Sequence, residues 1–369
     1  TLKFPDAGVY WYHPHMRDDY ALELGLYGNF LVTPTSPTYW NAVNREIAIF
    51  LDDILMKDGK IAPFYKNRTD RAMMGRFGNI MFTNGETDYT LSVKKGEVIR
   101  FYFTNSASAR PFNISIARIK MKLVGGDSGA YEREEWKDAV MVSPSERAIV
   151  EAFFDTAGEY EIQNKTPDKT YSLGKIIVSE EPAASANTGL FQTLHNNKEV
   201  IKSIDPFRSF FMNVVDKRIK LSIYMMGSGM SMGTPVAGIE WDDTDNAQMN
   251  SVSDTEMVAW KIIDQDTDKK NMDIDWKFKV GDKVKIRIVN DDSSAHPMQH
   301  PIHFHGQRFL VVNQNGIPQT NLVWKDTVNV PAGEYVDIIL DASNPGTWMA
   351  HCHILEHIEA GMMFSFKVE

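Results

Sequence analysis

The stretch KGEVIRFYFTN, residues 95–105, returns later in the chain as VGDKVKIRIVN, residues 280–290. Each copy has a glycine and an acidic residue, then alternating apolar residues, then an asparagine. This pattern is typical of a turn that leads into a strand with one buried face. A second pair, WKDAVMVSPSERAIV (136–150) and WKDTVNVPAGEYVDI (324–338), follows in the same order and at a similar offset. The chain therefore contains two homologous β domains.

A third, partial copy of the repeat lies at the start of the chain. GVYWYHPH (8–15), GEYEIQNK (158–165) and GTWMAHCH (346–353) each have a glycine, an aromatic residue two positions on, and then a strand pattern. The first and third copies end in paired histidines, whereas the second has Gln163 and Lys165 at those positions. We therefore expect the middle domain to be a copy of the same scaffold that binds no metal.

Two segments have the composition of linkers between these copies. TPTSPTYW (33–40) and EEPAASANTG (180–189) are rich in proline, serine, threonine or alanine. They predict three domains, at residues 1–36, 37–185 and 186–369. Short alternating strands separated by glycine and proline turns predict an all-β fold of tandem cupredoxin-like Greek-key sandwiches, antiparallel and with few helices.

Composition narrows the classes of function. The 369 residues are 43% hydrophobic and 24% charged, which is ordinary for a globular protein. The net charge is −10 and no basic run stands out, so nucleic acid is a poor candidate partner. We find no stretch of about eighteen apolar residues, which a membrane-spanning helix requires. We therefore expect a soluble protein without a membrane span.

Histidines cluster around the single cysteine in HCHILEH, residues 351–357. Successive side chains on a strand point to opposite faces, so His351 and His353 share one side while Cys352 faces the other. The same geometry places His13 with His15, and His303 with His305. His300 is at an odd offset from the latter pair and can turn towards a separate centre.

Two different sets of ligands follow from these faces. The face of Cys352 can be completed by His300, His357 and Met362, which gives the ligands of a blue-copper site. The other face has only imidazoles, from His13, His15, His303, His305, His351 and His353. A closed zinc site needs only four ligands and would leave most of these unused. His195 and His296 have no such pairing, and we interpret both as structural or solvated.

Three motifs, WYHPH, HPIHFHG and HCHILEHIEAGM, resemble three of the four copper signatures of the multicopper oxidases, the family of laccases, ferroxidases and bilirubin oxidases with three cupredoxin domains. The resemblance implies four coppers per complete protein. It assigns the type-1 copper to His300, Cys352, His357 and Met362. It assigns the type-2 copper to His303, and the type-3 pair to His13, His15, His305, His351 and His353.

The resemblance also implies an activity. A phenolic compound or a low-valent metal ion would give single electrons to the type-1 copper, and the route through Cys352 to His351 and His353 would deliver four of them to dioxygen, forming water. Together with His357 these residues would form the catalytic set. The family resemblance further implies an extracytoplasmic location, periplasmic or secreted. The copper motifs are equally compatible with either class of reductant.

The chain departs from the family pattern in one signature. The H-x-H-G motif of the first domain is absent, and the repeat would place it upstream of Thr1. We therefore expect a processed or truncated chain, completed by roughly 60 to 100 further residues or by a companion chain. If these ligands are never supplied, the alternative is a copper-binding or electron-transfer protein without oxidase turnover.

Two features remain open at the level of sequence. Some members of the family carry a proton-donating acid directly after the last histidine of the final motif, but this chain has Ile358 there. The alternatives are Glu356, Glu359, Asp18, Asp19 and Glu23. The methionine-rich stretch YMMGSGMSMG (224–233) is interpreted either as flexible packing or as a Cu(I)-binding segment.

Overall fold

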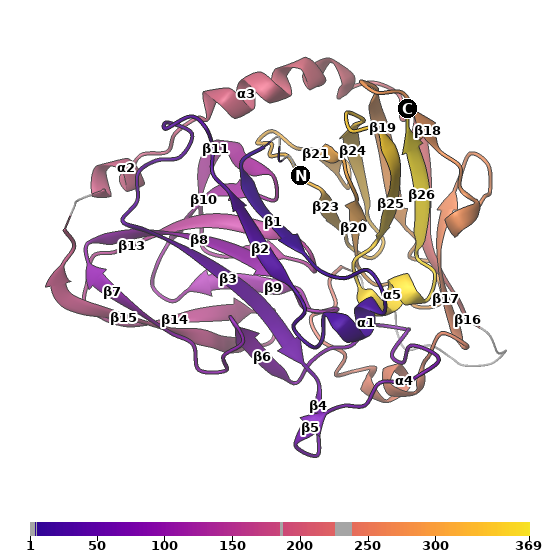
Figure 1. The fold of residues 1–369 in the computed structure, drawn as a ribbon, viewed down its shortest axis with the longest axis horizontal. Coiled ribbons are helices and arrows are strands. Elements are labelled where there is room, and N and C mark those ends of the chain that lie inside the picture. Colours follow the sequence, from indigo (N-terminus) through magenta and orange to yellow (C-terminus); the bar gives the residue numbers. More distant parts are fainter. Residues whose placement is uncertain (1–3, 5, 185–186, 226–237) are drawn as a thin grey trace.

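The computed structural model describes residues 4, 6–184, 187–225 and 238–369. Two β-sandwiches lie side by side, with the short N-terminal β1–β2 pair between them (Figure 1). The pair is antiparallel and is formed by β1 (Gly8–Tyr12) and β2 (Gly28–Val32). The predicted all-β fold of tandem cupredoxin-like sandwiches is confirmed.

The first sandwich contains a six-stranded and a five-stranded sheet. In spatial order the larger sheet is β11 (Gly129–Lys137), β10 (Met121–Gly126), β13 (Arg147–Phe154), β8 (Glu97–Asn105), β3 (Arg45–Ile54) and β6 (Ile80–Thr83). The smaller sheet is β12 (Val140–Val142), β9 (Phe112–Ile116), β14 (Gly158–Lys165), β15 (Thr170–Pro182) and β7 (Thr90–Lys95). A hairpin, β4 (Met56–Lys57) with β5 (Lys60–Ile61), projects from this sandwich.

The second sandwich repeats this arrangement strand for strand. Its larger sheet is β22 (Ile317–Pro318), β21 (Arg308–Gln314), β24 (Tyr335–Asp341), β19 (Lys283–Asn290), β16 (Lys217–Met225) and β17 (Val258–Asp264). Its smaller sheet is β23 (Thr327–Val330), β20 (His300–Phe304), β25 (Gly346–Cys352), β26 (Met363–Val368) and β18 (Lys277–Phe278). The repeated sequence motifs therefore reflect a repeated topology.

The sheets are mixed, which corrects the expectation of purely antiparallel sandwiches. Each sandwich has two parallel pairs, β3 with β8 and β7 with β15 in the first, and β16 with β19 and β18 with β26 in the second. Strands that are distant along the chain are brought together by long connections, and such connections allow parallel pairing.

The helices of the described residues are short, and helix is a minor part of this structure, as predicted. They are α1 (Asp18–Ala21), α2 (Thr188–Gln192), α3 (Lys198–Ile204), η1 (Asp205–Phe210), α4 (Ala247–Val252), η2 (Asn271–Asp273) and α5 (Leu355–Glu359). None of the helices in this part of the chain has the length and apolar character that a membrane crossing requires. Helix α1 packs against α5 through Ala21, Leu22 and Leu355, and this contact joins the N-terminal segment to the second sandwich.

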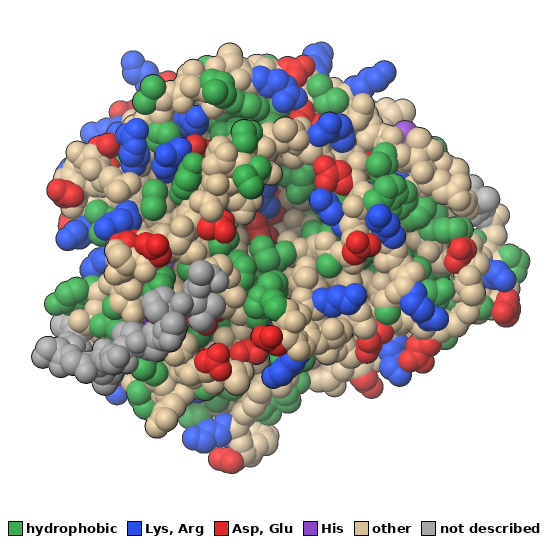
Figure 2. All heavy atoms as spheres, turned by 180° about the vertical axis from the view of Figure 1, so that it is seen from behind, with side chains coloured by type: hydrophobic (Ala, Val, Ile, Leu, Met, Phe, Trp, Pro, Cys, Tyr) green, Lys and Arg blue, Asp and Glu red, His purple; other side chains and the backbone are tan. Residues whose placement is uncertain are grey.

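Each sandwich has its own apolar core, one between the sheets of residues 45–182 and one between the sheets of residues 217–368. A smaller cluster, which includes Ala130, Ile204, Phe207 and Trp324, packs where the two sandwiches meet. The boundary predicted at 185 falls on residues 185–186, which lie outside the described residues, and the division into domains stays a prediction. Figure 2 shows acidic and basic side chains interspersed over the face opposite to that in Figure 1.

Candidate metal centres

Strand β25 separates two groups of candidate ligands. It pairs with β20 in a register that places Cys352 opposite Ile302 and His351 opposite His303. The side chain of Cys352 is part of the apolar core of the second sandwich, whereas His351 contacts the rings of other histidines. The alternation predicted from sequence is therefore present in the structure.

The first group contains Cys352, His300 and His357. The Cys352 Sγ lies 3.5 Å from the His300 Nδ1 and 3.6 Å from the His357 Nδ1, and the two nitrogens are 3.3 Å apart. All three side chains are fully buried. Met362 is also fully buried, and its backbone carbonyl accepts a hydrogen bond from the Cys352 N–H. We call His300, Cys352 and His357 the cysteine centre.

The cysteine centre packs against a tryptophan, Trp260, which the sequence analysis did not identify. The Trp260 ring centroid lies 4.2 Å from that of His357 and 4.7 Å from that of His300. Trp260 is fully buried, and its indole N–H donates to the Ala72 carbonyl. Because both imidazoles pack against one fixed ring, their orientation is set before any metal binds.

The electrostatics of the cysteine centre fit a soft metal ion. Burial lowers the pKa of His300 to about 3 and holds the pKa of His357 well below its ordinary value, so both imidazoles are neutral electron-pair donors. Burial also raises the pKa of the Cys352 thiol. A bound cation reverses that preference by favouring the thiolate. Two nitrogen donors and one sulfur donor that converge in an apolar pocket suit copper.

The second group contains six histidines, which we call the histidine cluster: His13, His15, His303, His305, His351 and His353. The Nε2 atoms of His305 and His351 are 2.9 Å apart. The nitrogens of His15, His305 and His351 lie close enough together to hold one metal ion. Trp11 packs against His13 and His353, with centroids 4.5 and 5.2 Å apart. The structure thus brings together all six predicted residues.

In four of these histidines the Nδ1 atom is engaged by the protein. The Nδ1 atoms of His13, His303 and His351 lie 3.0, 2.9 and 2.8 Å from backbone carbonyl oxygens. The Nδ1 of His15 lies 3.0 Å from a carboxylate oxygen of Asp18. Because an Nδ1–H donor leaves Nε2 with a free electron pair, these contacts prepare Nε2 as the metal-binding atom. Five of the six histidines, namely His13, His15, His303, His305 and His353, line a cavity of about 160 Å³.

Burial and mutual repulsion lower the pKa values of four histidines of the cluster, His13, His305, His351 and His353. Burial lowers the pKa of His305 to about 2, with a further contribution from His303, and lowers the pKa of His13 to about 4. The pKa values of His351 and His353 are also well below the ordinary range because both side chains are buried. Several uncharged nitrogen donors around one small cavity suit a group of metal ions that carry the positive charge themselves.

The other sequence candidates have different positions. The His195 Nδ1 lies 3.3 Å from the Glu134 Oε2 and 3.1 Å from the Asn41 Nδ2. These partners belong to neither centre, which supports a structural role for His195. His296 is 6% exposed, so of the two alternatives, structural or solvated, the solvated one is wrong. Glu356 is buried and accepts a hydrogen bond from the Ser108 hydroxyl. Most of the methionine-rich stretch, residues 226–233, lies outside the described residues.

Comparisons with known proteins agree with this arrangement. A family model for multicopper oxidases matches residues 239–369, which include the whole cysteine centre. The multicopper oxidase mco of Staphylococcus aureus is 24% identical over 378 aligned residues, covering 100% of this chain and 70% of that protein. Laccase-2 of Trametes versicolor is 23% identical, covering 98% of this chain and 71% of that protein. Residues 239–369 therefore form a multicopper oxidase domain, and the chain as a whole is similar to multicopper oxidases and laccases.

Solved structures of the family have the same fold. The multicopper oxidase of Campylobacter jejuni, described as a metallo-oxidase, superposes with a TM-score of 0.72 and 23% identity over 98% of this chain and 72% of its own. A multicopper oxidase of Aquifex aeolicus superposes with a TM-score of 0.70 and 21% identity, over 99% and 76%. The multicopper oxidase domain and these similarities support copper as the metal and an oxidoreductase as the class of enzyme.

Proposed function

We propose that this multicopper oxidase accepts single electrons from a reductant at the cysteine centre and delivers them to dioxygen at the histidine cluster, forming water. One observation carries the proposal. Cys352 belongs to the cysteine centre, and its chain neighbours His351 and His353 both belong to the histidine cluster. Bound copper would supply one-electron redox chemistry at both places. The two centres are thus joined by the backbone of a single tripeptide.

The protein surroundings of Cys352 suit an electron-transfer role. The Ile354 N–H lies 3.4 Å from the Cys352 sulfur and donates to it, and apolar side chains surround the centre. Hydrogen bonds to the sulfur and a hydrophobic environment tune the redox potential of such sites. Burial of all three ligands also excludes water from the route between the centres. We propose that His303 holds a type-2 copper and the other five histidines a type-3 pair.

Oxygen consumption tests the proposal. The copper-loaded protein is supplied in parallel with a phenol, Fe(II) and Cu(I), beside the Cys352→Ser variant. We expect uptake of dioxygen with at least one reductant, four electrons per dioxygen, and loss of this uptake in the variant. A protein that has the blue absorption but consumes no dioxygen with any of the three would instead be a copper-binding or electron-transfer protein without turnover.

A second observation favours a metal ion as the reductant. A carboxylate oxygen of Glu240 and the Nε2 of His296 lie 4.0 Å apart, both are buried, and neither has a hydrogen-bond partner within the described part of the chain. Burial and then the nearby Asp242, Asp245 and Asp243 raise the pKa of Glu240 to about 7. A carboxylate oxygen and an imidazole nitrogen without hydrogen-bond partners, next to further acidic side chains, are suitable ligands for a cation.

The position of this pair connects it to the cysteine centre. The side chain of Gln299, the residue before His300, bonds to both the backbone N–H and the carbonyl of Glu240. An electron donor bound at Glu240 would therefore lie beside a ligand of the cysteine centre. Because Glu240 and His296 offer one oxygen and one nitrogen, we propose low-valent iron or copper as the substrate class.

The Glu240→Gln variant separates the two classes of reductant. We expect kcat/KM with Fe(II) or Cu(I) to fall by about tenfold or more, the equivalent of ~1.4 kcal/mol, while kcat/KM with a phenol stays unchanged. Asp275→Asn is the matched control, because it removes one charge from an exposed pair with Lys269. Equal losses with the phenol and the metal ions would contradict a cation site at Glu240.

A further inference from the structure

His303 is held by the protein through the nitrogen that points away from the histidine cluster. Its Nδ1 lies 2.9 Å from the Asp326 carbonyl oxygen, 3.1 Å from the Thr327 hydroxyl and 3.4 Å from the Asp326 carboxylate. The carbonyl and the carboxylate only accept hydrogen bonds, so Nδ1 carries the proton and Nε2 is left with its electron pair. The orientation of the ring thus depends on the position of Asp326.

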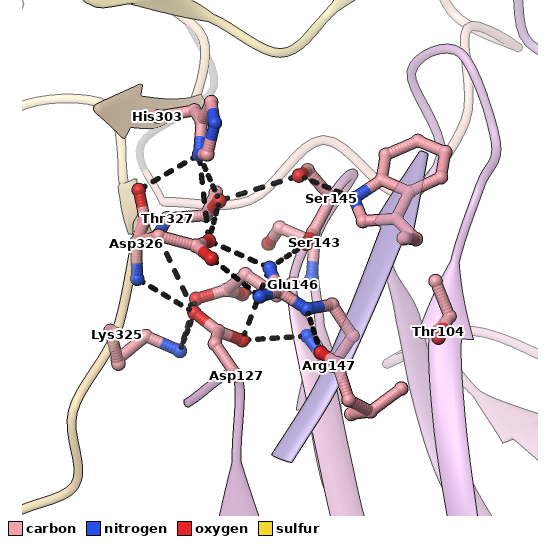
Figure 3. A network of polar contacts seen from close by, with 12 residues as sticks. Thr104, Asp127, Ser143, Ser145, Glu146, Arg147, His303, Lys325, Asp326 and Thr327 are labelled. Carbon is pink, nitrogen blue, oxygen red and sulfur yellow. Dashed lines mark hydrogen bonds and ion pairs between the residues drawn. The ribbon is translucent and has the colours of Figure 1, made fainter. Parts of the chain in front are cut away.

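Asp326 is in turn held by an arginine from the other sandwich. The Arg147 guanidinium donates to both carboxylate oxygens, with Nη1–Oδ1 at 2.7 Å and Nη2–Oδ2 at 2.5 Å. Arg147 is on β13, in the sandwich that has no paired histidines, and its side chain is 1% exposed. Figure 3 shows Asp326 between His303 and Arg147. A bidentate pair of this kind fixes geometry as well as charge.

The remaining donors of Arg147 reach a third part of the chain. Its Nε donates to the Val9 carbonyl at 2.9 Å, and Nη1 also donates to the Ser145 carbonyl at 2.8 Å. Val9 is on β1, four residues before His13. One guanidinium therefore contacts the N-terminal strand pair, its own sandwich and the loop that precedes β23 of the second sandwich. All three segments lie next to the histidine cluster.

The surrounding charges keep this arginine in place. The Asp127 carboxylate accepts from the Arg147 backbone N–H at 2.8 Å, and Lys325 lies 3.2 Å from Asp127 and 3.3 Å from Glu146. Asp127 is fully buried. Two cations are thus arranged among the three carboxylates of Asp127, Glu146 and Asp326, as Figure 3 shows. The excess of negative charge is next to the place where metal ions would bind.

We propose that Arg147 is a positioning residue for the metal at the histidine cluster: it fixes Asp326, and Asp326 fixes His303 with Nε2 towards the cavity. The sandwich without paired histidines would thereby determine the geometry of a centre to which it gives no ligand. The inference rests on the proposed role of the histidine cluster in binding copper. Metal affinity and activity commonly fall roughly 10- to 100-fold when an outer-shell partner of a ligand is lost.

The Arg147→Lys variant tests this inference, because lysine keeps the charge but cannot form the bidentate contact or reach Val9 at the same time. Copper(II) is titrated into the metal-free protein, and the metal content and the electron paramagnetic resonance spectrum are recorded. We expect the copper affinity of the histidine cluster to fall by about 10-fold or more, with changed hyperfine splitting of its paramagnetic copper. The blue absorption of the cysteine centre should remain and serve as the internal measure of folding.

Arg287→Lys is the matched control. Arg287 makes a similar bidentate pair with Asp337, at 2.7 and 2.8 Å, on strands β19 and β24 away from the histidines. We expect its copper spectrum to match that of the wild type. A folded Arg147→Lys protein with the wild-type copper content and spectrum would overturn the inference and leave Arg147 a purely structural residue.

Asp326→Asn decides the matter if Arg147→Lys does not fold. This variant keeps the size of the side chain and removes the charge that Arg147 holds, so the same spectral change is expected with the blue absorption intact. An unchanged spectrum would again overturn the inference. A wild-type protein whose histidine cluster takes up no copper would instead count against the proposed function, and the two failures are distinguishable.

Discussion

The two sandwiches contain the same pair of central strands, but the side chains on these strands differ in whether they can bind a metal. In the first, Ile114 of β9 pairs with Asn164 of β14; in the second, Ile302 of β20 pairs with Cys352 of β25. The next pair along is Ser115 with Gln163 in one and His303 with His351 in the other. The backbone register is therefore identical, and a few side chains alone separate a scaffold from a candidate metal centre.

The same contrast exists at the repeated motif of residues 136–140 and 324–328. Asp138 is exposed, whereas the corresponding Asp326 is bound by Arg147 beside His303. Lys137 pairs with Glu135 at the surface, whereas Lys325 lies among buried carboxylates. The same sequence pattern thus makes buried ion pairs between the two sandwiches only in its second copy, residues 324–328.

Replacing the sulfur with the residue of the other sandwich should have the largest effect. We expect Cys352→Asn, which copies Asn164, to abolish the thiolate-to-copper absorption at about 600 nm while copper remains at the histidine cluster. The visible spectrum and metal analysis measure both. Asn164→Ser is the control and should leave the band unchanged. A blue band that persists in Cys352→Asn would show that the thiolate is not a ligand.

His303→Ser, which copies Ser115, should affect the other centre. We expect the copper affinity of the histidine cluster to fall by at least about 10- to 100-fold, because a ligand and its link to Asp326 are both lost. The blue absorption of the cysteine centre should remain. Titration with copper(II), followed by metal analysis, measures the change. An equal loss of copper from both centres would mean that they do not load independently.

Lys137 and Lys325, the equivalent lysines of the repeated motif, should differ in how much they contribute to the free energy of unfolding. Lys325→Met leaves the Glu146 carboxylate without a cation and the Asp127 carboxylate with Arg147 alone, so we expect the free energy of unfolding to fall by about 3–5 kcal/mol. Lys137→Met removes an exposed pair and should change it by only about 0.5 kcal/mol. Denaturation in urea measures both variants. If Lys325→Met lowers the free energy of unfolding as little as Lys137→Met does, the buried charges between the sandwiches do not stabilise the fold.

Asp52 of the first sandwich should make a smaller contribution to the free energy of unfolding, and this contribution should depend on pH. Burial raises the pKa of Asp52 to about 7, from 3.8, and Tyr27 donates to its carboxylate at 2.5 Å. The corresponding residue of β16 is Ser222, which does not titrate. Because the folded state holds the proton longer than the unfolded state, stability should fall between about pH 4 and 7, by ~1.4 kcal/mol per unit of pKa difference.

The Asp52→Asn variant isolates this contribution. We expect its urea midpoint to decline less than that of the wild type between pH 4 and 7, and the two to differ most above pH 7. Comparing the pair removes the effects of other buried acids such as Glu356, whose pKa burial raises to about 8. Parallel curves for the two proteins would mean that Asp52 is ionised in the folded state throughout.

Much of the site was accessible from the sequence because ligand spacing on a strand is a local property. The alternation in HCH separates Cys352 from His351 and His353 wherever the strand lies. Supporting residues were not accessible in this way. Trp260 is forty residues from His300 along the chain, and nothing in its own neighbourhood marks it as a partner of the ligand. The choice between a structural and a solvated His296 was also open in the sequence, because its burial depends on contacts with the segment around Glu240.

The sequence by itself determined the repeated sandwiches, the two faces of β25 and the types of side chain on each face, since each follows from periodicity over a few residues. Only the tertiary structure decided which imidazole nitrogen faces the cavity and what holds it there. Arg147 and Asp326 are 179 residues apart and belong to different sandwiches. Their contact exists only because the sheets pack in one arrangement, and no local pattern encodes such a distance.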